Sequence, residues 1–241
     1  MRRDRILAMG SLIAVIALCW LYLARMNMAT PGVVGAPLEQ FTAAFLIWTV
    51  MMVAMMLPTA VRAIDVFGAF ARKRMSAIGS APATSVFVLG YVAVWTAYAA
   101  FAAAGQVALS RTSLLAPTLH STSVVLSVAL LLLAGTFQFT SLKEACLTHC
   151  RSPFPFFLAN WRDGDWSAFM LGIQHGGYCV GCCWALMGLM FVFGAMSLLW
   201  MGALSVFMLC EKIVPARWHL DRGAGVVLIV WGVFLATRLL H

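Results

Sequence analysis

Residues 41–61 read FTAAFLIWTVMMVAMMLPTAV, a run of 21 residues without a charged side chain. About 20 apolar residues of helix cross the hydrocarbon core of a bilayer, so this run predicts a membrane-spanning helix. The whole chain has the same character, because hydrophobic residues make up 63% of its 241 residues and charged residues only 10%. Soluble domains are about half apolar and about a quarter charged. The composition therefore excludes a soluble globular domain, a disordered chain and a soluble coiled coil.

Six further apolar stretches predict an all-α polytopic membrane bundle of about seven transmembrane helices, forming a single domain over residues 1–241. The predicted spans are Ile6–Ala24, Phe41–Val61, Thr84–Leu109, Thr122–Ser141, Trp166–Phe191, Met196–Cys210 and Gly223–Leu240. We interpret the first stretch as a retained signal anchor rather than a cleaved signal peptide, because the apolar run is long and no Ala-x-Ala site follows it.

The basic residues predict the orientation of these spans. Thirteen of the 16 Lys and Arg residues lie at the N-terminus or in the second, fourth and sixth loops. The positive-inside rule then predicts a cytoplasmic N-terminus and an external C-terminus, in a bacterial inner membrane. The net charge of +8 does not indicate nucleic-acid binding, because the charges stand between apolar stretches and form no basic stripe with interleaved aromatic residues.

Five of the seven cysteines fall into two local groups. The first is Cys146 and Cys150, at the predicted cytoplasmic end of the fourth span, where residues four apart share one face of a helix. Thiols at this spacing suit soft-metal binding or thiol redox chemistry. Cys19 and Cys210 stand apart and are interpreted as packing residues.

The second group is denser and lies within residues 175–187, which read HGGYCVGCCWALM. His175, Cys179, Cys182 and Cys183 fall within about two helical turns of one another. The neighbouring glycines at 176, 177 and 181 predict that the fifth helix is broken at this point, since glycine weakens a helix interior.

The second span adds Met52, Met55 and Met56, whose thioethers are further soft ligands, and Pro58, which frees a carbonyl near Ala54. Whether the two cysteine groups form one site stays open. A straight fifth helix would separate Cys150 from Cys182 by about 20 Å of depth. They form one site if the fourth loop dips inward or the fifth helix starts later, and otherwise they are an entrance and an interior station.

These motifs together resemble a bacterial family of unknown function whose members are described as metal-binding integral membrane proteins. The resemblance covers about Phe41 to Leu240. It is carried by Trp48 with Met52-Val-Ala-Met55-Met56-Leu-Pro58, Gly90-Tyr91 with Trp95, Leu142–Pro153 with Cys146 and Cys150, Gly172, Gly176–Met187 and Glu211-Lys212. It implies a bound metal, but neither the identity of the metal nor an activity.

The leading hypothesis is a protein that handles a soft metal, copper(I) first and zinc second, for transport, delivery or cofactor insertion. Thiolate and thioether ligands select Cu(I), and the absence of Asp and Glu inside the spans disfavours manganese, magnesium, calcium and a di-iron centre. The predicted main ligands are Cys179, Cys182, Cys183 and His175, assisted by Met52, Met55 and Met56, with Cys146 and Cys150 as a cytoplasmic station. The expected partners are the lipid bilayer, a metal ion and a metallochaperone or client membrane complex.

Two alternatives remain. Cys179-x-x-Cys182 has the spacing of a redox pair, which would suit a membrane thiol-disulfide oxidoreductase. The chain would otherwise be a structural or assembly subunit of a membrane complex. Glu211 and Lys212, which follow the sixth span, are interpreted as an ion pair or an interface anchor.

Overall fold

The computed structural model describes residues 2–27, 36–74, 77–112, 123–194 and 197–240, and every secondary-structure element in these ranges is helical. The all-α prediction is therefore confirmed for them. Thr122 and Met196, the first residues of the predicted fourth and sixth spans, lie outside the described residues. The elements are α1 (Arg2–Asn27), α2 (Pro37–Arg74), α3 (Ala77–Arg111), α4 (Val124–Phe137), α5 (Ser141–Arg151), α6 (Pro153–Asn160), α7 (Asp165–Gly188), α8 (Met190–Phe193), α9 (Leu198–Ile213), a 3-10 turn η1 (Ala216–Trp218) and α10 (Leu220–Leu240).

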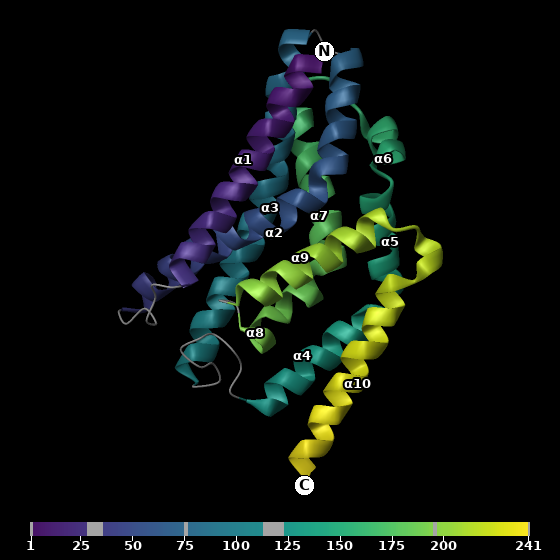
Figure 1. The fold of residues 1–241 in the computed structure, drawn as a ribbon. Helices are drawn as coiled ribbons and strands as arrows, with labels where there is room; N and C mark the ends of the chain where they lie inside the picture. Colours follow the sequence, from purple (N-terminus) through teal and green to yellow (C-terminus); the bar gives the residue numbers. More distant parts are fainter. Residues whose placement is uncertain (1, 28–35, 75–76, 113–122, 195–196, 241) are drawn as a thin grey trace.

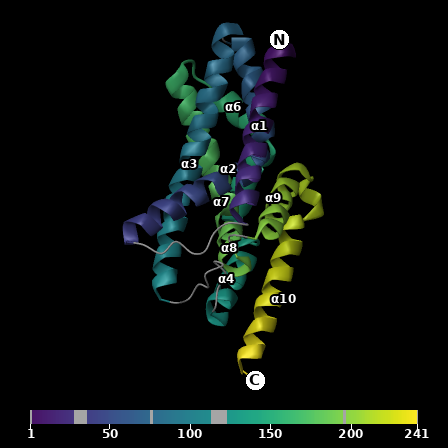
Figure 2. The same cartoon turned by 60° about the vertical axis from the view of Figure 1, so that its left-hand side comes forward.

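The long helices α2, α3 and α7 pack side by side and form the centre of the bundle, with α1 against α2 (Figure 1). Helix α10 packs along α4 and forms a second layer, which Figure 2 shows lying away from α3. Helix α9 runs obliquely at mid-height and contacts α1, α2, α5, α7 and α8. The two ends of the chain lie at opposite ends of the molecule (Figure 1).

The number of spans differs from the seven that the sequence predicts. Five of the described helices, α1, α2, α3, α7 and α10, are long and apolar enough to cross a membrane. Helices α4 and α5 make a sixth if they count as one span, but they are bent by 65°. Helix α9, the predicted sixth span, has 16 residues, fewer than the roughly 20 that a bilayer core requires.

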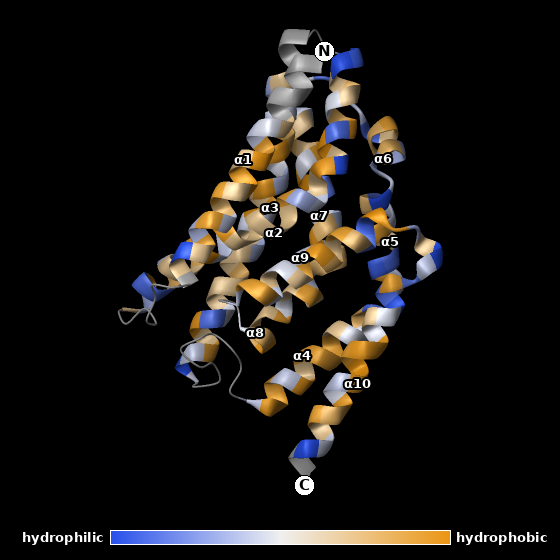
Figure 3. Ribbon diagram, in the orientation of Figure 1, coloured by the Kyte–Doolittle hydropathy of each residue, from blue (hydrophilic) through white to orange (hydrophobic). Residues whose placement is uncertain are grey.

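The outer faces of the bundle are apolar, as Figure 3 shows along α1, α4 and α10. Large apolar side chains point outward there, including Ile13 and Leu18 on α1 and Val227 and Val230 on α10. A soluble protein rarely leaves so continuous an apolar patch in water. The surface is compatible with a chain embedded in lipid.

Helix α7 is continuous from Asp165 to Gly188, so the predicted break at its glycines is wrong. Apart from Gly177, the glycines of this part of α7 serve close packing instead. A Cβ added to Gly172 would lie 2.1 Å from the Phe87 carbonyl oxygen of α3, and one on Gly181 would lie 2.7 Å from the Cys146 sulfur of α5. Gly176, four residues after Gly172, also faces α3, with the Tyr91 carbonyl oxygen 3.2 Å from an added Cβ, and small residues at this spacing let membrane helices approach closely. These contacts fix α7 against both neighbours.

Helix α2 also continues through its proline. Pro58 leaves the Ala54 carbonyl without its helical partner, as predicted, and the indole Nε1 of Trp20 on α1 donates a hydrogen bond to that oxygen at 3.1 Å. The contact satisfies the freed acceptor and attaches α1 to α2 near the methionine-rich turn.

Candidate metal site

The bend between α4 and α5 brings the first cysteine group to the second. Helix α5 starts afresh after Gln138–Thr140, because the Thr140 side chain caps it by accepting a hydrogen bond from the Lys143 amide at 3.3 Å. The new helix then packs along α7. As a result the Cys150 sulfur lies 4.0 Å from the Cys182 sulfur, so the two groups meet through Cys150.

Four thiols gather at this point, all of them buried and none of them in a disulfide bond. The sulfurs of Cys182 and Cys183 are 3.3 Å apart, and the Cys182 thiol donates to the Cys179 carbonyl at 3.2 Å. The Cys179 side chain also interacts electrostatically with those of Cys150, Cys182 and Cys183. The spacing of these residues along α7 predicted their common location, and Cys150 completes the group from α5.

A buried cation contacts the thiol cluster. Lys212 of α9 is 5% exposed, and its Nζ donates to the Cys179 sulfur at 2.9 Å and to the Thr59 hydroxyl at 2.8 Å. The Tyr91 hydroxyl of α3 lies 3.1 Å from the same sulfur and donates to the Met56 carbonyl at 3.0 Å. Helices α2, α3 and α9 thus meet at Cys179.

The predicted ion pair between Glu211 and Lys212 is not formed. Glu211 instead accepts from Lys143 Nζ of α5 at 2.8 Å, and both side chains are almost fully buried. Adjacent residues on a helix point in different directions, which is why Lys212 reaches the thiols while Glu211 faces α5. Arg151 Nε also donates to the Glu211 carbonyl oxygen at 2.7 Å. These contacts fasten α9 to the helix that carries Cys150.

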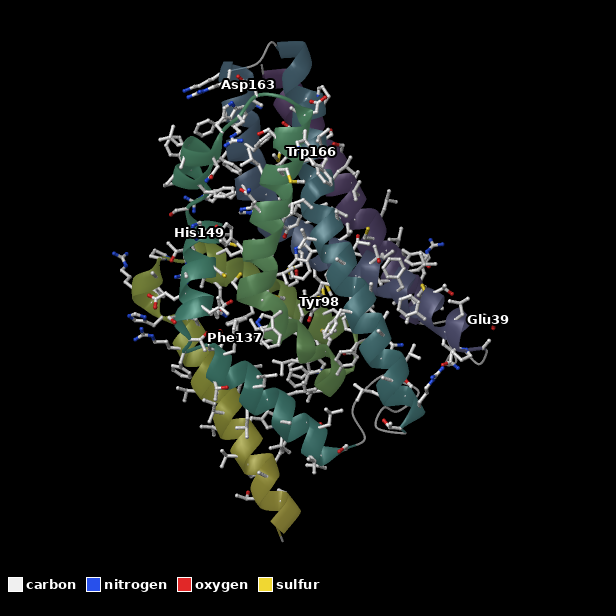
Figure 4. The ribbon with its side chains drawn as sticks, turned by 180° about the vertical axis from the view of Figure 1, so that it is seen from behind. Glu39, Tyr98, Phe137, His149, Asp163 and Trp166 are labelled. Carbon is white, nitrogen blue, oxygen red and sulfur yellow. The ribbon has the colours of Figure 1, made fainter. Side chains whose placement is uncertain are left out.

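Trp184 fixes the rotation of α7 one residue beyond the cysteines. Its backbone carbonyl accepts a hydrogen bond from the Tyr98 hydroxyl of α3 at 2.9 Å, and its ring meets that of Phe137 at the end of α4 edge to face. Figure 4 labels Tyr98 and Phe137 on the two helices, together with His149 on α5. The His149 ring stacks on Tyr178 of α7 at 4.2 Å between centroids.

His175 lies one turn before Cys179 and is 2% exposed. Aromatic rings surround it, with the Tyr91 ring centroid at 6.0 Å and that of Phe87 at 6.1 Å. Its Nδ1 has no hydrogen-bond partner among the described residues. A buried polar atom left unpaired costs about 1–3 kcal/mol, and this nitrogen therefore requires an explanation.

The remaining predicted ligands are placed differently. Cys146 lies one turn before Cys150 on α5, and its sulfur packs against Gly181 of α7. Met52, Met55 and Met56 are fully buried. Met56 reaches the site through its carbonyl, and Met55 accepts a hydrogen bond from the Ser205 hydroxyl through its own. Metal binding by these sulfurs stays a prediction.

Across the described ranges, no group of three or more His, Cys, Asp or Glu side chains is already arranged to hold a metal ion. Pairs of thiols nevertheless fit one. With metal–sulfur bonds of about 2.3 Å, the length in zinc thiolates, two sulfurs on one ion lie at most about 4.6 Å apart. The 4.0 Å between Cys150 and Cys182 falls inside that limit. A donor set of thiols suits Cu(I), which accepts a pair of thiolates.

The site includes residues that sequence reasoning missed, namely Thr59, Tyr91, Lys143 and Lys212. The charged residues were assigned to span ends, where charge is easily solvated, yet Lys143 is 0% exposed and Glu211 1%. Their signal was present in the sequence, because a Lys or Glu within a predominantly apolar chain is expected to have a buried partner.

A protein-family model described as PpoB2, copper chaperone, matches residues 45–235. No curated protein and no solved structure matches the chain. The match spans every residue of the thiol cluster and its Lys212 contact.

Proposed function

Because the chain belongs to the PpoB2 copper chaperone family, we propose that it holds a Cu(I) ion between the thiols of Cys150 and Cys182 and delivers it to a copper-dependent client protein. The observation that carries this proposal is the 4.0 Å approach of these two sulfurs from different helices. A pair of thiolates contributed by two separate elements binds tightly when the elements are together and releases the ion when they part.

The other thiols serve as exchange partners. Cys183 lies 3.3 Å from Cys182, and Cys179 interacts electrostatically with both. Ligand exchange among neighbouring thiolates moves an ion without leaving it free at any stage. Cys146, on the same helix as Cys150, and the thioethers of Met52, Met55 and Met56 are proposed as auxiliary ligands, with zinc as the second candidate metal.

Charge balance in the buried site supports a monovalent ion. Two thiolates on Cu(I) carry one net negative charge, and burying an uncompensated charge is costly. The ammonium group of Lys212 contacts Cys179 directly and offsets that charge. Tyr91 of α3 holds the Cys179 thiol in place, and Thr59 of α2 holds the Lys212 ammonium.

The proposed location is the bacterial inner membrane, with the N-terminus in the cytoplasm. The five apolar helices and the exposed apolar faces of α1 and α10 support an integral membrane protein. The distribution of Lys and Arg supports the orientation. The client is then a membrane or external copper protein.

The test is the metal content of the detergent-purified chain, measured by mass spectrometry with reductant present. We expect near-stoichiometric copper in the wild type and a loss of at least about tenfold in Cys182→Ser/Cys183→Ser. Cys19→Ser/Cys210→Ser is the matched control. It removes the same number of thiols, but both are half-buried and lie outside the cluster, which stays intact. Zinc in place of copper would show that the metal site exists but that its metal is zinc. Metal-free wild type with redox-dependent alkylation would favour the oxidoreductase.

His175 supplies a second prediction. We propose that its unpartnered Nδ1 is a ligand on the Cys179 side of the site. His175→Phe fills the same aromatic surroundings without a nitrogen, so the fold is retained while the affinity for Cu(I) falls by about 10- to 100-fold. Competition with a chromophoric Cu(I) chelator measures the affinity. Unchanged affinity together with a higher melting temperature would show that His175 only packs.

A further inference from the structure

A cavity of about 450 Å³ opens beside the thiol cluster, between α1, α2, α5 and α9. Its outer part is lined by Met9, Arg62, Asp65 and Ile213, of which Arg62 and Ile213 are exposed. Its inner wall is formed by Thr59, Cys150 and Lys212, all buried. The cavity therefore leads from the surface of the protein to the thiols.

The rim of this cavity faces water or lipid headgroups rather than hydrocarbon. Arg62 and Asp65 stand one turn apart on α2 and both line it, and charged side chains are expensive inside the hydrocarbon core. With Lys212 at the inner wall the lining carries two cations and one anion, which favours an anionic guest.

One thiol is reached first along this route. Of the cysteines that the structure describes, Cys150 alone lines the cavity. Cys182 lies behind it at 4.0 Å, and Cys179 lies behind Lys212. An ion that enters by the cavity meets Cys150 before any other member of the cluster.

We infer that this cavity is the copper entrance, and that Cu(I) arrives there bound to a small anionic thiol and is transferred to Cys150. The inference rests on the proposed function and adds the route and the class of donor. The volume of the cavity is that of a small-molecule pocket, which admits a thiol peptide but not a folded protein.

The transfer is a ligand exchange without electron transfer. The Cys150 sulfur forms a bond to Cu(I), the bond between copper and the donor sulfur breaks, and the proton of the Cys150 thiol leaves with the donor thiol. Copper stays Cu(I) throughout. Cys182, whose sulfur is 4.0 Å away, then forms the second copper–sulfur bond as a second donor sulfur leaves the copper, and the proton of the Cys182 thiol leaves with that donor thiol.

The experiment measures the rate at which the full-length purified chain takes up Cu(I) from two donors. One is the anionic Cu(I)–glutathione complex and the other the cationic Cu(I)–acetonitrile complex. Arg62→Glu is expected to slow Cu(I) loading from the glutathione complex by about tenfold and to leave loading from the acetonitrile complex unchanged. Arg222→Glu, an exposed charge reversal on α10 away from the cavity, is the matched control.

A second variant tests the route itself. Ile213→Trp narrows the mouth, so loading from both donors slows and Cys150 becomes protected from N-ethylmaleimide, while the final copper content equals that of the wild type. Leu199→Trp, also an exposed residue of α9 but outside the cavity, should load normally. Equal rates of Cu(I) loading in the two Trp variants, or alkylation of Cys182 before Cys150, would overturn the assignment of the cavity as the copper entrance. The proposed metal site would not be affected by that result. A wild-type protein that takes up no copper would overturn both the entrance and the proposed metal site.

Discussion

Replacing Lys143 with Met is expected to lower the free energy of unfolding by about 3–5 kcal/mol, because it leaves the carboxylate of Glu211 buried without its partner. The two side chains are 0% and 1% exposed and meet at 2.8 Å. Their contact joins α5, which carries Cys150, to α9, which carries Lys212. Titration with sodium dodecyl sulfate from mild detergent measures the loss.

The double variant Lys143→Met/Glu211→Leu separates the value of the pair from the cost of breaking it. Replacing both charges by apolar groups is often neutral or stabilising for a buried pair, so the double variant should regain most of the loss. Glu144→Gln, which removes an exposed carboxylate from the same helix, should have little effect. If Lys143→Met is as stable as Glu144→Gln, the buried ion pair contributes nothing to the fold.

The stability of the Lys143→Met variant depends on pH, and the sign of that dependence can be derived. Burial raises the pKa of the Glu211 carboxyl above its ordinary range, and the neighbouring Lys143 ammonium opposes this. Without Lys143 the folded-state pKa rises further above the unfolded value. Between the unfolded-state and folded-state pKa values, the folded protein holds a proton on Glu211 that the unfolded chain lacks. The contribution of this group to the free energy of unfolding is therefore fully present below the unfolded-state pKa and is lost as the pH rises through the folded-state pKa. Lys143→Met should therefore lose more stability than the wild type between mildly acidic and mildly alkaline pH.

The helical architecture and part of the site follow from local patterns. Uncharged runs of about 20 residues predict helices that cross a bilayer, and five of the predicted spans are found as long apolar helices. Likewise, intervals of three and four residues place Cys179, Cys182 and Cys183 together on α7 once that segment is helical. Such features depend on residues close together in the sequence.

The joining of Cys150 to the cluster depends on long-range packing. It requires the 65° bend between α4 and α5, and the distance between Cys150 and Cys182 depends on where α5 packs against α7. The local signal for the bend was Thr140, whose side chain caps the new helix. The direction that α5 then takes depends on its contacts with α7 and α9, which a single sequence does not specify.

The glycines of α7 show why one residue type supports opposite predictions. Glycine weakens an isolated helix, and on that ground a break was predicted. It also removes the side chain that keeps two helices apart, and in a membrane the gain from close packing outweighs the propensity cost. Which effect dominates depends on whether another helix faces the glycine, as α3 faces Gly172.

Gly172→Ala is expected to destabilise the protein by about 3 kcal/mol and to weaken copper binding as well. The added Cβ would lie 2.1 Å from the Phe87 carbonyl oxygen and 3.0 Å from the Tyr91 amide nitrogen, both of them backbone atoms of α3. Backbone cannot rotate away as a side chain can, so α3 and α7 must separate, and overpacking of this kind costs about 1–3 kcal/mol or more. Tyr91 moves with α3 and loses its 3.1 Å contact with Cys179.

Gly177→Ala is the matched control, on the same helix and with no atom within 4 Å of an added Cβ. Alanine is the better helix former by about 1 kcal/mol, so this variant should equal or exceed the wild type in stability. Unfolding in detergent and Cu(I) affinity are measured for both variants. A Gly172→Ala protein with wild-type stability would mean that α3 and α7 do not approach this closely. Reduced stability with unchanged affinity would mean that the thiols bind copper without support from Tyr91.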